Sequence, residues 1–218
     1  MLKGHCSRLW LLCCAAPLLL LLALPAFVDE LESSNPYQLM QQLAQRTFER
    51  INREQQQITH DVNYLRVIVR QELMPFVHIR YTGALILGPL FNTLDAEQQQ
   101  RYFQALEAYL EQSYAEVLAL YRQYDYHLEP EKPFTNRTVV TVRLHLLRKA
   151  LTPLRIDFKW RQNSKNQQWQ LYDILVEGIS LIATKQQEWT ALLRRLGFEA
   201  FIEQLHEDAR QSVTPQEG

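Results

Sequence analysis

Cysteine and glycine are scarce in this sequence, which has 3 Cys and 6 Gly among 218 residues. Cys6, Cys13 and Cys14 all lie near the N-terminus, so the rest of the chain has neither a disulfide framework nor thiolate chemistry. An excess of positive charge is also absent, because 23 Lys and Arg stand against 24 Asp and Glu. This balance argues against sequence-independent nucleic-acid binding, which needs a positive field. The 47% of hydrophobic residues suffices for a sizeable core, and the length suits one domain or two small ones.

Common catalytic and metal-binding motifs are missing as well. No GxSxG nucleophile elbow is present, and the segment from Gly83 to Gly88 lacks the Lys and the Ser or Thr of a phosphate-binding loop. Beyond the N-terminal segment the histidines occur singly, with no HExxH or paired spacing: His60, His78, His127, His145 and His206. The motifs therefore predict no catalytic residue, no metal site and no cofactor.

The N-terminal segment has the plan of a secretory signal peptide. Lys3 and Arg8 precede an apolar run over residues 9–24, and the small residue Ala26 follows shortly before the first acidic residues. We predict cleavage after Ala26, which makes residues 1–26 a signal peptide. A retained membrane anchor is the alternative, because the apolar run approaches the ~17 residues that a membrane span needs.

A hydrophobic period of three and four predicts helices over the first half of the remaining chain. Amphipathic stripes run over residues 35–51 and 62–73, and a longer, aromatic-rich stripe follows Asp95. The segment 71–91 is mostly apolar but is interrupted by glycine and proline, so it predicts short buried helices. These helices need a partner surface for their apolar faces.

The period changes to two after Tyr124, which predicts strands. Apolar and polar residues alternate over 138–146 and 154–161, and 169–176 is apolar on both faces. Helices then return from residue 179, with Gly197 placed to end the first of them. The order of helices, sheet and helices predicts an α+β domain with helices on one face of a curved antiparallel sheet. We assign residues 27–211 to this single domain and residues 212–218 to a flexible tail.

Basic residues are concentrated in the predicted sheet. Residues 137–165 contain eight Lys and Arg against the single acid Asp157. A solvated sheet face explains this pattern, and so does a docking surface for acidic proteins or anionic lipid head groups. The predicted docking residues are Arg143, Arg155, Lys159 and Arg161.

Two carboxylates in or beside the last strand are the remaining chemical candidates. Asp173 or Glu177 could have a raised pKa and act as a base, with Tyr172, Tyr121 or Tyr126 nearby. The alternative is that these carboxylates bind backbone amides or pair with cations. An isomerase or hydrolase that uses Asp173 is thus one hypothesis for the function, and a non-catalytic envelope adaptor is another.

Three segments of the sequence resemble those of the MlaC family. The members of this family are periplasmic phospholipid-binding proteins, which are also called toluene-tolerance auxiliary proteins. These segments are NPYQLMQQLAQRTFERI, QELMPFVHIRYTGALILG and DFKWRQNSKNQQWQLYDILVEGISLIATKQQEW. The stretch YDILVEGISL with the Trp-bearing helix after it is the most specific. The resemblance covers almost the whole chain after the signal peptide, and it departs from the family mainly around residues 145–151.

The resemblance implies a curved antiparallel sheet covered by helices, of the nuclear-transport-factor-two-like type, with a deep apolar cavity. It implies a soluble periplasmic carrier that shuttles glycerophospholipids and so maintains outer-membrane lipid asymmetry. The partners would be an outer-membrane lipoprotein associated with a porin and an inner-membrane ABC transporter with an MCE-domain subunit. No enzymatic activity belongs to the family pattern, and we expect a monomer.

With this resemblance, apolar residues of the predicted helices and strands become candidates for lining the cavity and binding lipid. They are Ile68, Leu73, Phe76, Val77, Tyr81, Leu85, Leu87, Phe103, Leu106, Leu110, Val142, Leu144, Phe158, Trp160, Tyr172, Ile174 and Val176. The alternative is a closed core, because apolar stripes in proteins usually pack against one another.

Overall fold

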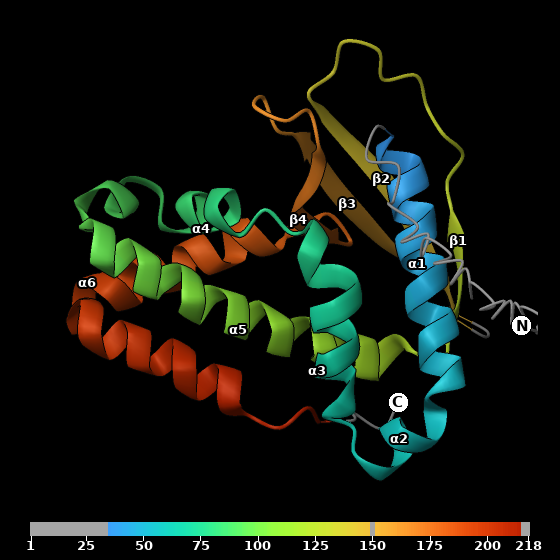
Figure 1. The fold of residues 1–218 in the computed structure, drawn as a ribbon, viewed down its shortest axis with the longest axis horizontal. Coiled ribbons are helices and arrows are strands. Elements are labelled where there is room, and N and C mark those ends of the chain that lie inside the picture. The colour runs from blue at the N-terminus through green and yellow to red at the C-terminus, as the bar shows by residue number, and fades with distance from the viewer. Residues whose placement is uncertain (1–34, 149–150, 215–218) are drawn as a thin grey trace, which may run out of the picture. The chain divides into compact units, whose positions relative to one another are not determined.

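A computed structural model describes residues 35–148 and 151–214, so the predicted signal peptide and the end of the predicted tail lie outside it. Helical elements come first: α1 (Pro36–Arg53), α2 (Gln55–His60), α3 (Tyr64–Ile68), the π turn η1 (Val69–Leu73), the 3-10 turn η2 (Met74–Phe76), α4 (Ile79–Leu87), the 3-10 segment η3 (Gly88–Thr93) and α5 (Ala96–Tyr121). A sheet and a last helix follow: β1 (Asp125–Leu128), β2 (Val139–Leu147), β3 (Leu154–Gln162), β4 (Trp169–Val176), β5 (Ile179–Ser180) and α6 (Leu181–Arg210). Helices precede and follow the sheet, as the sequence predicts (Figure 1).

Local capping explains why the two principal helices of the first half begin where they do. The Asn35 side chain accepts a hydrogen bond from the Tyr37 backbone amide at 2.9 Å, and proline occupies the first position of α1. At α5, Asp95 and Gln98 form a reciprocal capping box. None of the described helices is long and apolar enough to span a bilayer.

The five strands form an open antiparallel sheet in the order β1-β2-β3-β4-β5. Alternation sends Leu144 of β2 and its partner Ile156 of β3 to one face, which is buried. The opposite face carries the next pair, Arg143 and Asp157. One sheet face is therefore apolar and the other charged.

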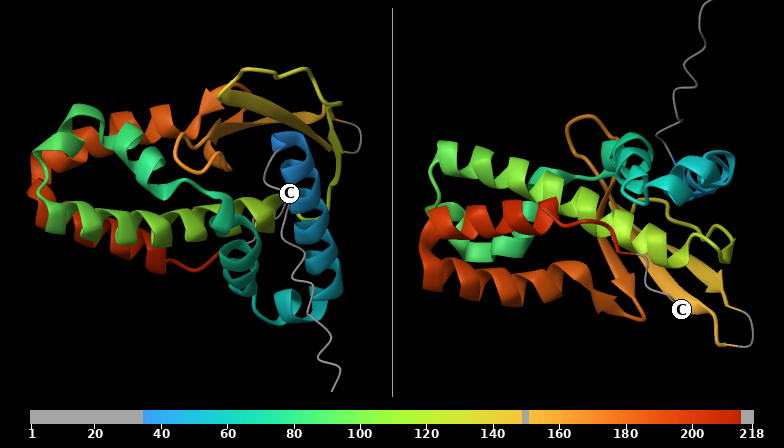
Figure 2. Two further views of the ribbon diagram at one scale, coloured as in Figure 1. Left: turned by 45° about the horizontal axis from the view of Figure 1, so that its top comes forward. Right: turned by 90° about the horizontal axis from the view of Figure 1, so that it is seen from below.

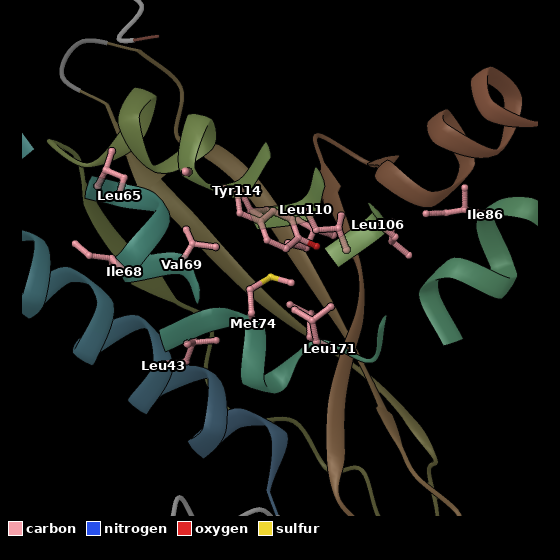
Figure 3. Packing of buried hydrophobic residues seen from close by; sticks show 14 of the residues in the cluster. Leu43, Leu65, Ile68, Val69, Met74, Ile86, Leu106, Leu110, Tyr114 and Leu171 are labelled. Atoms are coloured by element: carbon pink, nitrogen blue, oxygen red, sulfur yellow. The ribbon is translucent and has the colours of Figure 1, made fainter. Parts of the chain in front are cut away.

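Helices cover the apolar face from two sides. Helix α1 packs against β2, and α5 packs between α3, α4 and α6 (Figure 2). Where α5 meets the middle of the fold, Leu110 and Tyr114 gather with Met74 and Leu171 of β4 (Figure 3). The core is thus continuous from the helices to the sheet.

Two glycines shape the helical part for different reasons. A Cβ atom at Gly83 would lie 2.8 Å from the Leu106 Cδ2 atom, so the close approach of α4 to α5 requires glycine. Gly197 has a φ of 77°, and the two halves of α6, orange and red in Figure 1, run in different directions on its two sides. The two helices predicted around Gly197 are these halves. After α6, Val213 is buried and its amide donates to the Asn63 Oδ1 atom at 2.9 Å.

Asp173 fastens α6 to the sheet. Its carboxylate accepts hydrogen bonds from the Ser180 hydroxyl at 2.8 Å and from the Ile182 backbone amide at 3.2 Å. Glu177 accepts from the Arg155 backbone amide at 2.6 Å. Both carboxylates therefore bind backbone amides, which is the structural alternative that the sequence left open. An anion at the first turn of a helix is also favoured by the helix dipole.

We predict that Asp173→Ala lowers the free energy of unfolding by about 1–3 kcal/mol, because a buried cap and its hydrogen bonds are lost. Chemical denaturation of the mature protein measures the change. The control is Glu188→Ala, which removes an exposed partner of Lys185 on the same helix and should change stability by less than about 0.5 kcal/mol. Equal effects of the two substitutions would contradict the anchoring role of Asp173.

Candidate functional site

An apolar cavity lies between α1, the last turns of α5 and the buried face of the sheet. Its volume is about 100 Å³. The lining residues are Met40, Leu43, Ala44, Thr47, Phe48, Leu73, Val117, Leu118, Tyr121, Leu144, Leu146, Ile156 and Phe158. Only the hydroxyls of Thr47 and Tyr121 are polar among these side chains, so the cavity suits a hydrocarbon ligand and offers little to a charged one.

Helical and strand periodicity together build the walls. Met40, Leu43, Ala44 and Thr47 recur at three and four along α1 and form one side. On the opposite side, the register of β2 with β3 places consecutive inward-facing pairs next to each other, Leu144 with Ile156 and Leu146 with Leu154.

Aromatic rings close the cavity where α1 approaches β1. The Phe48 and Tyr126 rings are stacked with centroids 4.7 Å apart. Burial raises the pKa of Tyr126, and the neighbouring carboxylate of Glu49 raises it further. The Tyr126 hydroxyl is therefore neutral at physiological pH and leaves this edge of the cavity uncharged.

A surface groove of about 430 Å³ adjoins the cavity along α5. Its lining residues are Tyr109, Leu110, Ser113, Tyr114, Glu116, Val117, Leu120, Leu181, Lys185 and Thr214. Val117 belongs to both the groove and the cavity, and it is 41% exposed. The cavity therefore reaches the surface beside Val117.

The structure brings only part of the sequence-predicted lipid-binding set to the cavity. Leu73, Leu144 and Phe158 line it. Most of the others are buried in the surrounding core: Ile68, Val77, Leu87, Phe103, Leu106, Leu110, Val142, Trp160 and Ile174. The rest are partly exposed: Phe76, Tyr81, Leu85, Tyr172 and Val176. Contact of these fourteen residues with lipid stays a prediction.

Sequence reasoning did not assign the α1 wall or the end of α5 to the cavity. The stripe of Met40, Leu43 and Ala44 was visible as a core-facing helical pattern, but a stripe does not reveal which surface it covers. Leu146 and Ile156 alternate with polar residues in the same way as the predicted lining residues Leu144 and Phe158. Only the tertiary placement of α1 over the sheet identifies these side chains as a wall.

The predicted docking cations are largely on the charged face of the sheet. Arg143 pairs with Asp157 at 2.6 Å and with Glu129 at 3.4 Å, so its charge is balanced locally. Hydrogen bonds from Lys132 and His145 lower the pKa of Glu129 to about 2, which keeps this network ionised. Alternation with cavity-lining neighbours places Arg155 and Lys159 on the same face.

The fourth docking candidate makes a different contact. The Arg161 guanidinium lies 4.2 Å from the centroid of the Tyr81 ring, which is a cation–π geometry. Asp173 does not line the cavity, because its carboxylate is bound to the start of α6. Within residues 35–148 and 151–214, no group of three His, Cys, Asp or Glu side chains could hold a metal ion.

Comparison with known proteins agrees with this architecture. The family model described as MlaC protein matches residues 41–207. The intermembrane phospholipid transport system binding protein MlaC of Haemophilus influenzae is 32% identical over 181 residues, which are 83% of this chain and 85% of that protein.

Among solved structures, a phospholipid-binding protein from Ralstonia solanacearum, determined in complex with a phospholipid, superimposes with a TM-score of 0.68. It is 20% identical and covers 78% of this chain and 94% of its own, so the likeness shows a shared fold. The α+β fold predicted from the sequence is confirmed, with a five-stranded sheet that does not close. From the family match and the identity to the Haemophilus protein it follows that this chain belongs to the MlaC family.

Proposed function

We propose that this protein binds phospholipid and carries it through an aqueous compartment, with the acyl chains between α1 and the sheet. The observation that carries the proposal is the cavity, whose walls are apolar from both the helical and the sheet side. The names of the relatives, a phospholipid transport binding protein and a phospholipid-binding protein, support it.

A carrier is needed because a free diacyl lipid must keep tens of methylene groups away from water. Each exposed methylene costs about 0.8 kcal/mol, so escape of a lipid from a bilayer without a carrier is negligible. A cavity with few polar groups holds the tails without fixing them strongly, which allows the cargo to leave again. Thr47 and Tyr121 are the only lining side chains that could hydrogen-bond to cargo.

The cavity must enlarge to take up a lipid. Its volume of about 100 Å³ is below the ~300–1,000 Å³ of pockets for drug-sized ligands. Among the described residues, no hydrogen bond joins α1 to β2 or β3, so apolar packing holds the helix on these strands, and polar contacts occur at its ends, as between Asn35 and Glu131. Cargo can replace these apolar contacts with its own, because acyl chains and leucine side chains are chemically alike.

The transport route follows from the family rather than from the cavity. The proposed partners are an outer-membrane lipoprotein associated with a porin and an inner-membrane ABC transporter with an MCE-domain subunit. Between them the protein would act in the periplasm as a monomer without enzymatic activity and so maintain outer-membrane lipid asymmetry. The word intermembrane in the name of the Haemophilus relative supports this route.

We predict that organic extraction of the purified protein, followed by mass spectrometry, yields near-stoichiometric phospholipid. Ala44→Phe places a ring in the cavity and should lower the lipid content at least about five-fold, because the added side chain competes with the tails. Gln42→Phe places the same ring on the exposed side of α1, outside the cavity, and should retain wild-type lipid content.

Circular dichroism and thermal unfolding show whether Ala44→Phe remains folded. Absence of phospholipid from the wild-type protein would reject the carrier function and favour an adaptor. Turnover of a carbonyl substrate that Asp173→Asn abolishes would instead favour an enzyme.

Docking through the charged sheet face is a separate prediction. Lys159→Gln should weaken association with vesicles that contain the inner-membrane transporter, and the loss should shrink as salt is raised, because charges at the surface are screened. Removal of the charge is a better test than reversal, because Lys159 lies opposite the buried Asp173 and Arg143 is paired with Asp157. Binding of Lys159→Gln that equals wild-type binding at low salt would remove Lys159 from the docking surface.

Export of the protein should remove its signal peptide. The intact mass of protein recovered from the periplasmic fraction should correspond to a chain that begins at Phe27, because signal cleavage is predicted after Ala26. A full-length chain recovered with the membrane fraction would instead show that the apolar N-terminal run is retained as an anchor.

A further inference from the structure

Large exposed apolar side chains gather at one end of the sheet. Leu147 ends β2 and is 44% exposed, Leu151 in the β2–β3 connection is 63% exposed, and Ile179 after β4 is 66% exposed. The antiparallel register puts the three at the same end, since Leu146 lies opposite Leu154 and Ile156 opposite Val176. Such side chains in loops and at strand ends are not explained by packing within this chain.

Helix α5 adds two more apolar side chains at this end. The helix ends at Tyr121, and β1 begins shortly afterwards with Asp125 paired to Leu147. Val117 and Leu120, in the last turns of α5, are exposed and share their groove with Leu181, which follows Ile179 closely in sequence. We call Val117, Leu120, Leu147, Leu151 and Ile179 the apolar rim.

The apolar rim is continuous with the cavity. Val117 belongs to the cavity wall and to the exposed surface at once. Leu147 follows the cavity-lining Leu146 along β2, but alternation sends their two side chains to opposite faces of the sheet, so Val117 is the rim residue at which the cavity meets the surface. The groove beside Val117 is lined mainly by apolar and aromatic side chains, together with Glu116 and Lys185, and a hydrocarbon chain that leaves the cavity there would lie along it.

Two arginines flank the apolar rim without a carboxylate partner among the residues described. The Arg148 guanidinium donates to the Thr152 carbonyl at 2.6 Å, which holds it in the hairpin connection. The Arg155 guanidinium lies beside Gly178 in the turn that carries Ile179. Neither makes a salt bridge within residues 35–148 and 151–214, whereas Arg143, in the middle of the sheet, is paired with two acids. Neither arginine is thus neutralised by a salt bridge within these residues, although Arg155 is half-buried and the Glu177 carboxylate lies at its backbone amide.

We propose that the apolar rim, with Arg148 and Arg155, rests on the surface of an anionic lipid bilayer. Apolar side chains at loop ends enter the boundary between head groups and acyl chains, while arginines bind the phosphates. This inference deepens the carrier function and rests on it, since it places the mouth of the cavity directly against the membrane. Lipid tails could then pass between bilayer and cavity with little exposure to water.

Vesicle co-sedimentation of the mature protein tests the proposal. The probes are phosphatidylcholine vesicles with and without phosphatidylglycerol. We expect binding to the anionic vesicles that weakens with salt, and little binding to the neutral ones. Arg148→Gln and Arg155→Gln should each weaken the apparent affinity about five-fold, which is the loss of ~1 kcal/mol for one cation at a membrane surface.

The chain offers a matched pair for the apolar contribution. Leu147 and Val139 are the two ends of β2, and both are 44% exposed. Leu147→Ser should weaken vesicle binding at least about three-fold and Leu147→Ser with Ile179→Ser at least about ten-fold, from the lost burial of their methylene groups. Val139→Ser, at the opposite end of the sheet, should leave binding unchanged.

Phospholipid content by extraction separates this proposal from the carrier function. Folded rim variants should keep the wild-type lipid content, because Leu147 and Ile179 do not line the cavity. A wild-type protein that carries lipid but fails to bind anionic vesicles at low salt overturns the membrane contact and leaves the carrier function standing. Equal losses of vesicle binding for Val139→Ser and Leu147→Ser would overturn the membrane contact too. Rim substitutions that weaken binding to the transporter protein but not binding to lipid vesicles would also overturn it.

Discussion

The contact between α1 and the sheet determines most of what this protein can do. The helix presents a stripe of Met40, Leu43 and Ala44, and the strands present Leu144 and Ile156 in register. Packing of apolar side chains has no direction, so these two surfaces can separate and reassociate without breaking a hydrogen bond between them, and the polar contacts of α1 lie at its ends. A carrier needs such an interface, since each cycle must replace protein contacts by cargo and then restore them.

Helix α5 is tied to α3 and η1 by directional interactions in addition to apolar packing. Glu111 of α5 is buried and receives Arg66 at 3.3 Å and Arg70 at 2.7 Å. Near the end of α1, Arg50 binds Glu72 of η1 at 2.9 Å, and at the start of the helix the Asn35 side chain donates to the Glu131 carboxylate at 3.1 Å. Loss of one member of a partly buried pair leaves a charge without compensation, so these ties resist displacement more than the apolar contact does.

Helices and strands could be predicted from the sequence wherever the residues that determine them are close together in the chain. The caps at Asn35 and Asp95 act within a few residues, alternation predicts β2 and β3 nearly to their ends, and a run that is apolar on both faces predicts β4. The short strands β1 and β5 were not assigned, because four and two residues are too few to show a period. The family resemblance supplied the expectation of a cavity, but its α1 wall depends on the pairing of segments about a hundred residues apart, which no local pattern encodes.

The lengths of the outermost strands have a consequence for behaviour at high concentration. The sheet is open, yet its edge strands β1 and β5 have only 4 and 2 residues, and Val77 bridges to Leu171 beside β4. The strands β1 and β5 themselves therefore present only short rows of unpaired backbone amides and carbonyls, which offer another copy little template for edge-to-edge association. The first residues of β2 extend beyond β1, so the part of the sheet edge open to a further strand lies there, away from the end that carries Leu147 and Ile179.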